Sequence, residues 1–200
     1  MKKVLVIGAS GTIGQAIVKE LAQRHEVIQA SRSSTTHPVD IEHPDSITAL
    51  FERVGPVDAI VAAVGSLHFG PLTEMTGEQF RIGINSKLMG QVELVLRGQK
   101  YLNDGGSFTL TSGIGVDAAI PQIVNGAAVN CALEGFAAGA ATELARGQRI
   151  NVVSPTVLTE SMPTYGPYFI GFESAPAARV ALAYARSVDG LATGKTLRVW

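Results

Sequence analysis

The sequence predicts a single α/β domain built on a doubly wound parallel sheet of about seven strands, with helices on both faces. Three observations support this fold class. Short apolar runs alternate with longer amphipathic segments, the first apolar run leads straight into a glycine-rich turn, and no linker or internal repeat interrupts the pattern over residues 1–200. Strands that alternate with helices pair in parallel through right-handed crossovers, so we expect one domain.

The composition narrows the classes of partner and compartment. Apolar residues make up 46% and charged residues 16% of the chain, and the formal net charge is -1, which argues against disorder and against a nucleic-acid partner. No apolar run reaches the roughly 18 residues of a membrane helix. The run Val4–Ile7 is too short for a signal peptide, and Cys131 is the only cysteine. We therefore expect a cytoplasmic protein with no membrane partner, no internal disulfide and no metal site.

The elements of the N-terminal half begin with a strand that is buried on both faces. A continuous run of aliphatic residues that ends at glycine is typical of a central parallel strand. In the segment that follows, Ile13, Ile17 and Leu21 recur at helical spacing. In order, the expected elements are strand Val4–Ile7, a helix from about Thr12, strand Glu26–Ala30, a short third strand Val39–Ile41, helix Pro44–Val54 and strand Val57–Val64.

The C-terminal half continues the alternation. A long helix is expected between about Gly77 and Leu102, because apolar residues recur there every four positions from Phe80 to Leu96. An Ala- and Gly-rich helix is expected between about Pro121 and Arg146, ended by Gly147. The remaining expected elements are strand Ser107–Ser112, strand Ile150–Val153, helix Pro176–Ser187 and strand Thr196–Val199.

The turn after the first strand has the spacing of a phosphate-binding loop. Glycines at positions 8, 11 and 14 allow a sharp turn and a close approach of the backbone to a pyrophosphate. The helix that begins near Thr12 offers free N–H groups and the positive end of its dipole to the anion. Three glycines also occur in ordinary tight turns, but this turn lies where dinucleotides dock in Rossmann-type domains. The predicted pyrophosphate contacts are Gly8, Ser10, Gly11, Thr12, Ile13 and Gly14.

The end of the second strand bears on the choice of cofactor. NAD-binding sites often place an acidic residue there, whereas this chain has Ser31, Arg32 and Ser33. A guanidinium matches the oxygens of a phosphate, so these residues favour the 2′-phosphate of NADP(H). The alternative is an arginine that is simply solvated in a surface loop.

Seven segments, in the same order along the chain, resemble the short-chain dehydrogenase/reductase family from Val4 to Val199. The segments are Gly8–Gly14, Asp40-Ile41, Ala62–Gly65, Asn85, Gly106–Ser112, Ile150–Pro155 and Thr193–Leu197. The resemblance implies that Asp40 and Ile41 contact adenine, that Gly65 lies beside the cofactor, and that Pro155 and Val157 lie by the nicotinamide. It also implies catalytic roles for Asn85 and Ser112.

The catalytic motif of the family, Tyr-x-x-x-Lys on the helix after the serine strand, is missing. The resemblance places the Tyr position at Gly126, or at Asn125 in an alternative register, and the Lys position at Asn130. No Tyr lies between Tyr101 and Tyr165, and no Lys between Lys100 and Lys195. The usual acid/base pair is therefore absent in either register.

Two interpretations follow from this departure. In the first, the protein is an NADP(H)-dependent oxidoreductase for a small carbonyl or alcohol substrate. Ser112 then holds the carbonyl oxygen, Asn130 binds the ribose, and a non-standard group such as Tyr165 supplies the proton. In the second, it binds NADP(H) without turnover, as a redox sensor or an assembly partner. The resemblance also implies a homodimer or homotetramer, formed through the long helix and the Ala-rich helix.

Overall fold

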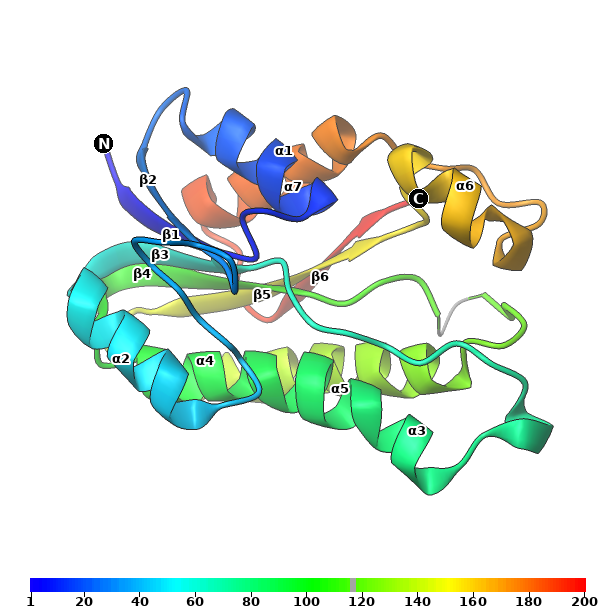
Figure 1. The fold of residues 1–200 in the computed structure, drawn as a ribbon. Coiled ribbons are helices and arrows are strands. Elements are labelled where there is room, and N and C mark those ends of the chain that lie inside the picture. The colour runs from blue at the N-terminus through cyan, green and yellow to red at the C-terminus, as the bar shows by residue number, and fades with distance from the viewer. Residues whose placement is uncertain (116–117) are drawn as a thin grey trace.

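A computed structural model describes residues 1–115 and 118–200, and within them the chain forms one six-stranded parallel sheet (Figure 1). The strand order is β2-β1-β3-β4-β5-β6. The strands are β1 (Lys3–Ile7), β2 (Glu26–Ala30), β3 (Val57–Ala62), β4 (Leu102–Thr111), β5 (Arg149–Pro155) and β6 (Lys195–Val199). The chain order reverses between β1 and β3, which is the switch point where α/β proteins bind ligands.

The short third strand expected at Val39–Ile41 was wrong, and it accounts for the difference between about seven strands and six. In the described part of the chain, residues 39–41 form no strand, and the isolated bridge nearby pairs Ser31 with Pro38, just before this segment. The backbone N–H of Asp40 donates to the Ser46 hydroxyl at 2.9 Å, and α2 (Pro44–Val54) follows directly. Val39 and Ile41 are nevertheless buried. Their apolar character therefore reflects packing against the core rather than strand pairing.

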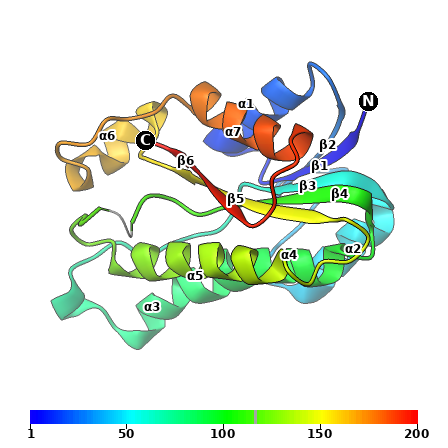
Figure 2. The ribbon, with the colours of Figure 1, turned by 180° about the vertical axis from the view of Figure 1, so that it is seen from behind.

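Helices cover both faces of the sheet, as the alternation predicts. Figures 1 and 2 show α2, α4 (Gly90–Gly98) and α5 (Val124–Ala140) on one face, and α1 (Thr12–Leu21) and α7 (Ala177–Asp189) on the other. Side chains of β1 alternate between two apolar cores, with Leu5 and Ile7 in the first and Val4 and Val6 in the second. The prediction that this strand is buried on both faces is confirmed, since these four residues have no exposed area.

The single long helix expected from Gly77 is divided into three parts. α3 (Gly77–Gly83) is followed by a π-helical turn, Ile84–Met89, and then by α4. One extra residue per turn shifts the phase of the side chains, and such turns are frequent at functional sites. Within this turn Asn85 is exposed, whereas Ser86 and Lys87 are buried against the sheet.

The Ala-rich helix is also shorter than expected, because α5 ends at Ala140 rather than near Arg146. α6 (Met162–Tyr165) lies beyond the end of β5, and α7 and β6 follow it in the chain. Figure 1 shows α6 beside the C-terminus, near the edge where the strands of the sheet end. The loops after β1, β3, β4 and β5 reach the same edge, so they frame the candidate site.

Candidate functional site

The glycine-rich turn after β1 is held by close backbone contacts. Gly8 has φ of +87°, and a Cβ on it would lie 2.2 Å from the Ala63 carbonyl oxygen. A Cβ on Gly14 would lie 2.0 Å from the Gly8 carbonyl oxygen. These two positions therefore accept only glycine. Gly11 is the N-cap of α1, and no side chain caps that end of the helix, so its first N–H groups are open to an anion.

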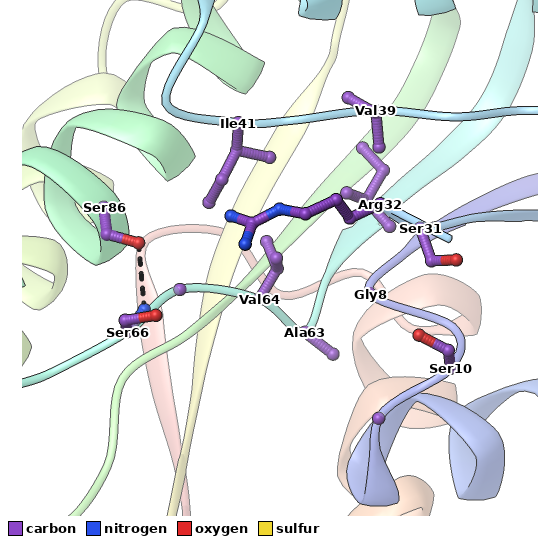
Figure 3. A pocket seen from close by; sticks show the side chains of 13 residues that line it. Gly8, Ser10, Ser31, Arg32, Val39, Ile41, Ala63, Val64, Ser66 and Ser86 are labelled. Atoms are coloured by element: carbon purple, nitrogen blue, oxygen red, sulfur yellow. Dashed lines mark hydrogen bonds between the residues drawn. The ribbon is translucent and has the colours of Figure 1, made fainter. Parts of the chain in front are cut away.

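A cavity of about 320 Å³ begins at this turn and extends along the carboxyl ends of β1, β2 and β3 (Figure 3). It is lined by Ile7, Gly8, Ser10, Gly11, Ser31, Arg32, Val39, Ile41, Ala63, Val64, Gly65, Ser66 and Ser86. The predicted contacts Gly8, Ser10, Gly11, Ser31, Arg32, Ile41 and Gly65 are thus brought together around one cavity. Thr12, Ile13, Gly14, Ser33 and Asp40 do not line it.

Arg32 extends across this cavity. Figure 3 shows its guanidinium between Ile41 and Val64. The side chain is 70% exposed and is paired with Asp40 at 3.4 Å and with Glu42 at 3.7 Å. The two carboxylates orient the guanidinium, and a bound phosphate has to compete with them. Exposed ion pairs of this kind are weak, so the arginine can turn toward an anion at small cost.

At the carboxyl ends of β4 and β5 lies a smaller cavity of about 150 Å³. It brings together Ser112, Asn130, Pro155 and Val157, which the sequence had placed at the reacting end of the site. The remaining lining residues are Leu67, Phe69, Lys87, Gly113, Ile114, Ile123, Gly126, Thr156 and Phe169. Apolar side chains dominate this list, so the cavity suits a substrate with an apolar body.

Lys87 is the unexpected member of this cavity. Its ammonium Nζ donates to the Ser112 carbonyl oxygen at 2.8 Å and to Asn130 Oδ1 at 2.9 Å. The residue is only 8% exposed, and burial lowers the pKa of its amine from 10.5 to about 8. A titratable group with a perturbed pKa in a cleft is a candidate functional group.

Sequence reasoning missed Lys87 because it looked for a lysine only after the serine strand. One signal was available. Lys87 lies three residues after Ile84, on the apolar side of the expected helix, where a lysine is uncommon. The π-helical turn that carries this side chain inward is not visible in the sequence.

The three predicted catalytic residues lie in different surroundings. The Ser112 hydroxyl donates to Glu134 Oε1 at 3.1 Å, so it must rotate before it can bind a substrate oxygen. Asn85 is exposed and lines none of the cavities described above. Tyr165 is 39% exposed and packs against Phe69, with ring centroids 5.2 Å apart.

Tyr165 belongs to a third cavity, of about 470 Å³. It is lined by Gly65, Ser66, Leu67, Phe69, Val157, Leu158, Ser161, Tyr165 and Phe169. It shares Gly65 and Ser66 with the cavity at the glycine turn, and Leu67, Phe69, Val157 and Phe169 with the cavity at Lys87. The three cavities therefore share walls along one edge of the sheet.

The two candidate Tyr positions also differ in their surroundings. Asn125 is fully buried, and its side chain accepts from the His68 N–H at 2.9 Å and donates to the Phe80 carbonyl oxygen at 2.6 Å. It therefore ties α5 to the loop after β3 and to α3. Gly126 faces the small cavity, and a Cβ there would lie 3.4 Å from Leu67 Cδ1, an ordinary contact.

No helix in the described part of the chain has the length and apolar character needed to cross a membrane. Residues 1–115 and 118–200 also hold no cluster of three or more His, Cys, Asp or Glu side chains arranged for a metal ion.

A parallel sheet with a glycine-rich turn at its switch point, and cavities along the carboxyl edge, defines the class of nucleotide-binding α/β proteins. The family follows from comparison with known sequences. Residues 8–188 match the family model described as enoyl-(acyl carrier protein) reductase. The chain belongs to the short-chain dehydrogenase/reductase family of oxidoreductases.

Several relatives are similar over most of their length. The protein lin1944 from Listeria innocua is 50% identical, with a TM-score of 0.98 and complete coverage of both chains. A small-chain dehydrogenase solved in complex with NADPH is 26% identical, with a TM-score of 0.89, covering 98% of this chain and 95% of that one. The 3-oxoacyl-(acyl-carrier-protein) reductase MabA of Mycobacterium tuberculosis is 29% identical over 80% of this chain and 71% of its own.

Proposed function

We propose that this protein is an NADP(H)-dependent oxidoreductase that interconverts a small, largely apolar carbonyl compound and its alcohol, using a proton donor other than the family tyrosine. One observation carries the proposal. The cavity at the glycine turn and the apolar cavity at Ser112 and Lys87 both share wall residues with the cavity at Tyr165. A dinucleotide along this edge would place its nicotinamide beside Pro155 and Val157, next to the space for a substrate.

The preference for NADP(H) rests on Arg32, Ser31 and Ser33 at the end of β2. Arg32 is the cation that lines the cavity at the glycine turn. No acidic side chain appears among the residues that line it, so none is placed to hold both ribose hydroxyls as NAD sites do. The relative solved with NADPH agrees with this choice.

The proposed substrate class follows from the walls of the cavity at Tyr165 and of the cavity at Ser112 and Lys87. Phe69, Tyr165 and Phe169 form an aromatic wall, and Leu67 and Val157 complete an apolar lining. Such a lining favours an acyl chain or an aromatic ring beside the carbonyl group. The relatives named 3-oxoacyl-(acyl-carrier-protein) reductase MabA and hydroxynaphthalene reductase-like protein Arp2 have names that refer to an acyl chain and to an aromatic ring, which agrees with this class.

Calorimetric titration with NADPH and NADH, followed by a screen of ketones and 3-oxoacyl thioesters, tests the proposal. We expect tighter binding of NADPH and oxidation of NADPH, seen as loss of absorbance, with at least one apolar ketone. Binding of NADPH without turnover across the screen would favour a cofactor-binding sensor instead. Equal affinity for both cofactors would contradict the assignment of Arg32.

We also infer that the protein forms a homodimer or homotetramer through α4 and α5. These helices lie side by side on one face of the sheet, and their outer surface holds a cavity of about 410 Å³ lined by Leu96, Phe136, Ala140 and Leu144, among others. Leu96 is 52% exposed. Light scattering should give a multiple of the 20.9 kDa chain mass, and Leu96→Glu should reduce that mass. A wild-type mass of one chain at micromolar concentration would refute the inference.

A further inference from the structure

Lys87 is a buried cation without a neutralising carboxylate in the described part of the chain. No salt bridge involves it among residues 1–115 and 118–200, and its two partners there are both uncharged oxygens. Burying an ammonium in this way disfavours folding, because the desolvation of the charge is not repaid by an opposite charge. A group kept at such a cost in a cleft points to a functional role.

The local backbone brings Lys87 to the reacting end of the site. Gly65, with φ of +118°, follows β3, and a Cβ on it would lie 2.5 Å from Lys87 Cα. The absence of a side chain at position 65 therefore lets the π-helical turn approach the strand end closely. From there Lys87 reaches Asn130, the position at which the family carries its lysine, but from the neighbouring helix rather than from α5.

The Lys87 ammonium also has an N–H group that is free to donate a proton. A lysine ammonium carries three N–H donors, and two of them are engaged by the Ser112 carbonyl and by Asn130. Lys87 lines the small apolar cavity together with Gly126, where the family has its phenol. The remaining N–H is the donor at this wall whose pKa is closest to neutral.

We propose that Lys87 is the catalytic acid of this protein and replaces the missing tyrosine; the proposal rests on the carbonyl reduction proposed above. Bound NADPH would supply a hydride, with its electron pair, to the carbonyl carbon as the C=O π bond opens toward oxygen. The Nζ–H bond of Lys87 breaks, and its proton goes to that oxygen. The products are the alcohol, NADP⁺ and a neutral amine, which regains a proton from water after product release.

The charge environment around Lys87 sets the pH dependence. The helices packed against its π-helical turn carry Glu78 and Arg81 on α3, Glu93 and Arg97 on α4, and Cys131 and Glu134 on α5, and His68 lies in the loop after β3. Glu134 reaches the site through the Ser112 hydroxyl, and it also accepts from Thr196. Burial of the amine lowers the pKa of Lys87.

This pKa, about 8, suits an acid at neutral pH. Reduction should therefore be constant near pH 7 and fall tenfold per pH unit above about pH 8, as the ammonium is lost. Other hydroxyl groups near the site are worse placed. The phenol of Tyr184 is fully buried against Thr111, and burial raises its pKa. The Ser112 hydroxyl already donates to Glu134.

The first experiment compares Lys87→Met and Lys87→Arg with Lys100→Met, a control at the exposed lysine beside Tyr101. Turnover with the best ketone of the screen is measured against pH, and the NADPH dissociation constant is measured by fluorescence. We expect both Lys87 variants to lose at least a hundredfold in kcat, with NADPH affinity changed less than tenfold. Lys87→Arg keeps the charge but does not release its proton. Full activity in Lys87→Met would overturn the proposal and leave the reductase function standing.

A second readout does not depend on turnover. In protein labelled with ¹³C at lysine Cε, the resonance that disappears in Lys87→Met reports the amine, and its shift is followed from pH 6 to pH 11. We expect a midpoint near pH 8 that changes when NADPH binds. A midpoint above pH 10, equal to that of the exposed lysines, would overturn the proposal even in an active enzyme. A wild-type protein that reduces no carbonyl compound overturns this proposal together with the proposed function.

Discussion

The cofactor-binding half and the reacting half of the site depart from their family to different degrees. Around β1, β2 and β3, the glycine turn keeps the backbone geometry that a dinucleotide needs, with Gly8 and Gly14 in contacts that only glycine can make. Around β4, β5 and α5, by contrast, α5 carries neither a tyrosine nor a lysine, and the positions we propose for that pair hold Gly126 and Asn130. Binding of the cofactor depends on the path of the backbone, whereas proton transfer depends on a single side chain that any neighbouring element can supply.

The same contrast appears in the space around the glycines. At positions 8 and 14, a Cβ would lie within 2.2 Å and 2.0 Å of a carbonyl oxygen. At Gly126, the nearest atom to a Cβ would be Leu67 Cδ1 at 3.4 Å. The first site is therefore sterically closed to substitution, while the second has room for a small side chain.

The largest expected effect comes from Gly14→Ala. Its Cβ would force apart the turn and α1, so we expect a loss of about 3 kcal/mol in the free energy of unfolding, measured by urea denaturation. Gly11→Ala is the matched control, since its Cβ would lie 3.5 Å from the Gly8 carbonyl oxygen, and should cost less than about 1 kcal/mol. Equal losses in the two variants would break the comparison.

Next in size is a pH effect on stability at Lys87. Its folded pKa, about 8, lies below the unfolded value of 10.5, so between these values the unfolded chain binds more protons and stability rises with pH. Relative to Lys87→Met, the wild-type free energy of unfolding should increase by about 2 kcal/mol between pH 8 and pH 10. Urea titrations at several pH values measure this difference. Parallel pH profiles for the two proteins would show that the amine is not buried.

A smaller effect is expected at Arg32. Arg32→Ala should weaken NADPH binding by about 1.5 kcal/mol, roughly tenfold, and leave NADH binding unchanged, because the guanidinium contact would be to the 2′-phosphate. This loss is at the low end of the roughly 1.5–3 kcal/mol expected for a hydrogen bond to a charged group, because the Arg32 side chain is 70% exposed and already paired with Asp40. Calorimetry measures both constants, and Arg53→Ala, at the end of α2, serves as the control. Equal weakening of NADPH and NADH would remove the basis for the assignment.

The smallest expected effect is on stability, at Gly126 in the reacting half of the site. Gly126→Ala should raise the free energy of unfolding by about 0.5–1 kcal/mol, because alanine is the better helix former inside α5 and its Cβ meets no close contact. Thermal denaturation of this variant beside Gly14→Ala compares the two glycines directly. A destabilised Gly126→Ala protein would mean that the reacting half is as tightly constrained as the cofactor half.

Local features of the chain could be predicted well from the sequence. The alternation of apolar runs and amphipathic segments predicted the parallel sheet with helices on both faces, and the glycine spacing predicted the turn between β1 and α1. The absence of tyrosine and lysine from the segment that forms α5 was also visible. These features depend on residues close together in the chain, where backbone sterics and hydrophobic periodicity act directly.

Tertiary structure decided the rest. Val39 and Ile41 have the composition of a strand, but they pack as a loop because the chain turns into α2. The π-helical turn changes the phase of its helix, so that Asn85 faces solvent while Lys87 reaches Asn130 and the Ser112 carbonyl. The sequence by itself determined the fold and the glycine turn, because both follow from local backbone preferences. Only packing between distant segments decided which side chain lies at the reacting end of the site. The direction of a long side chain depends on the phase of its helix and on the residues packed around it.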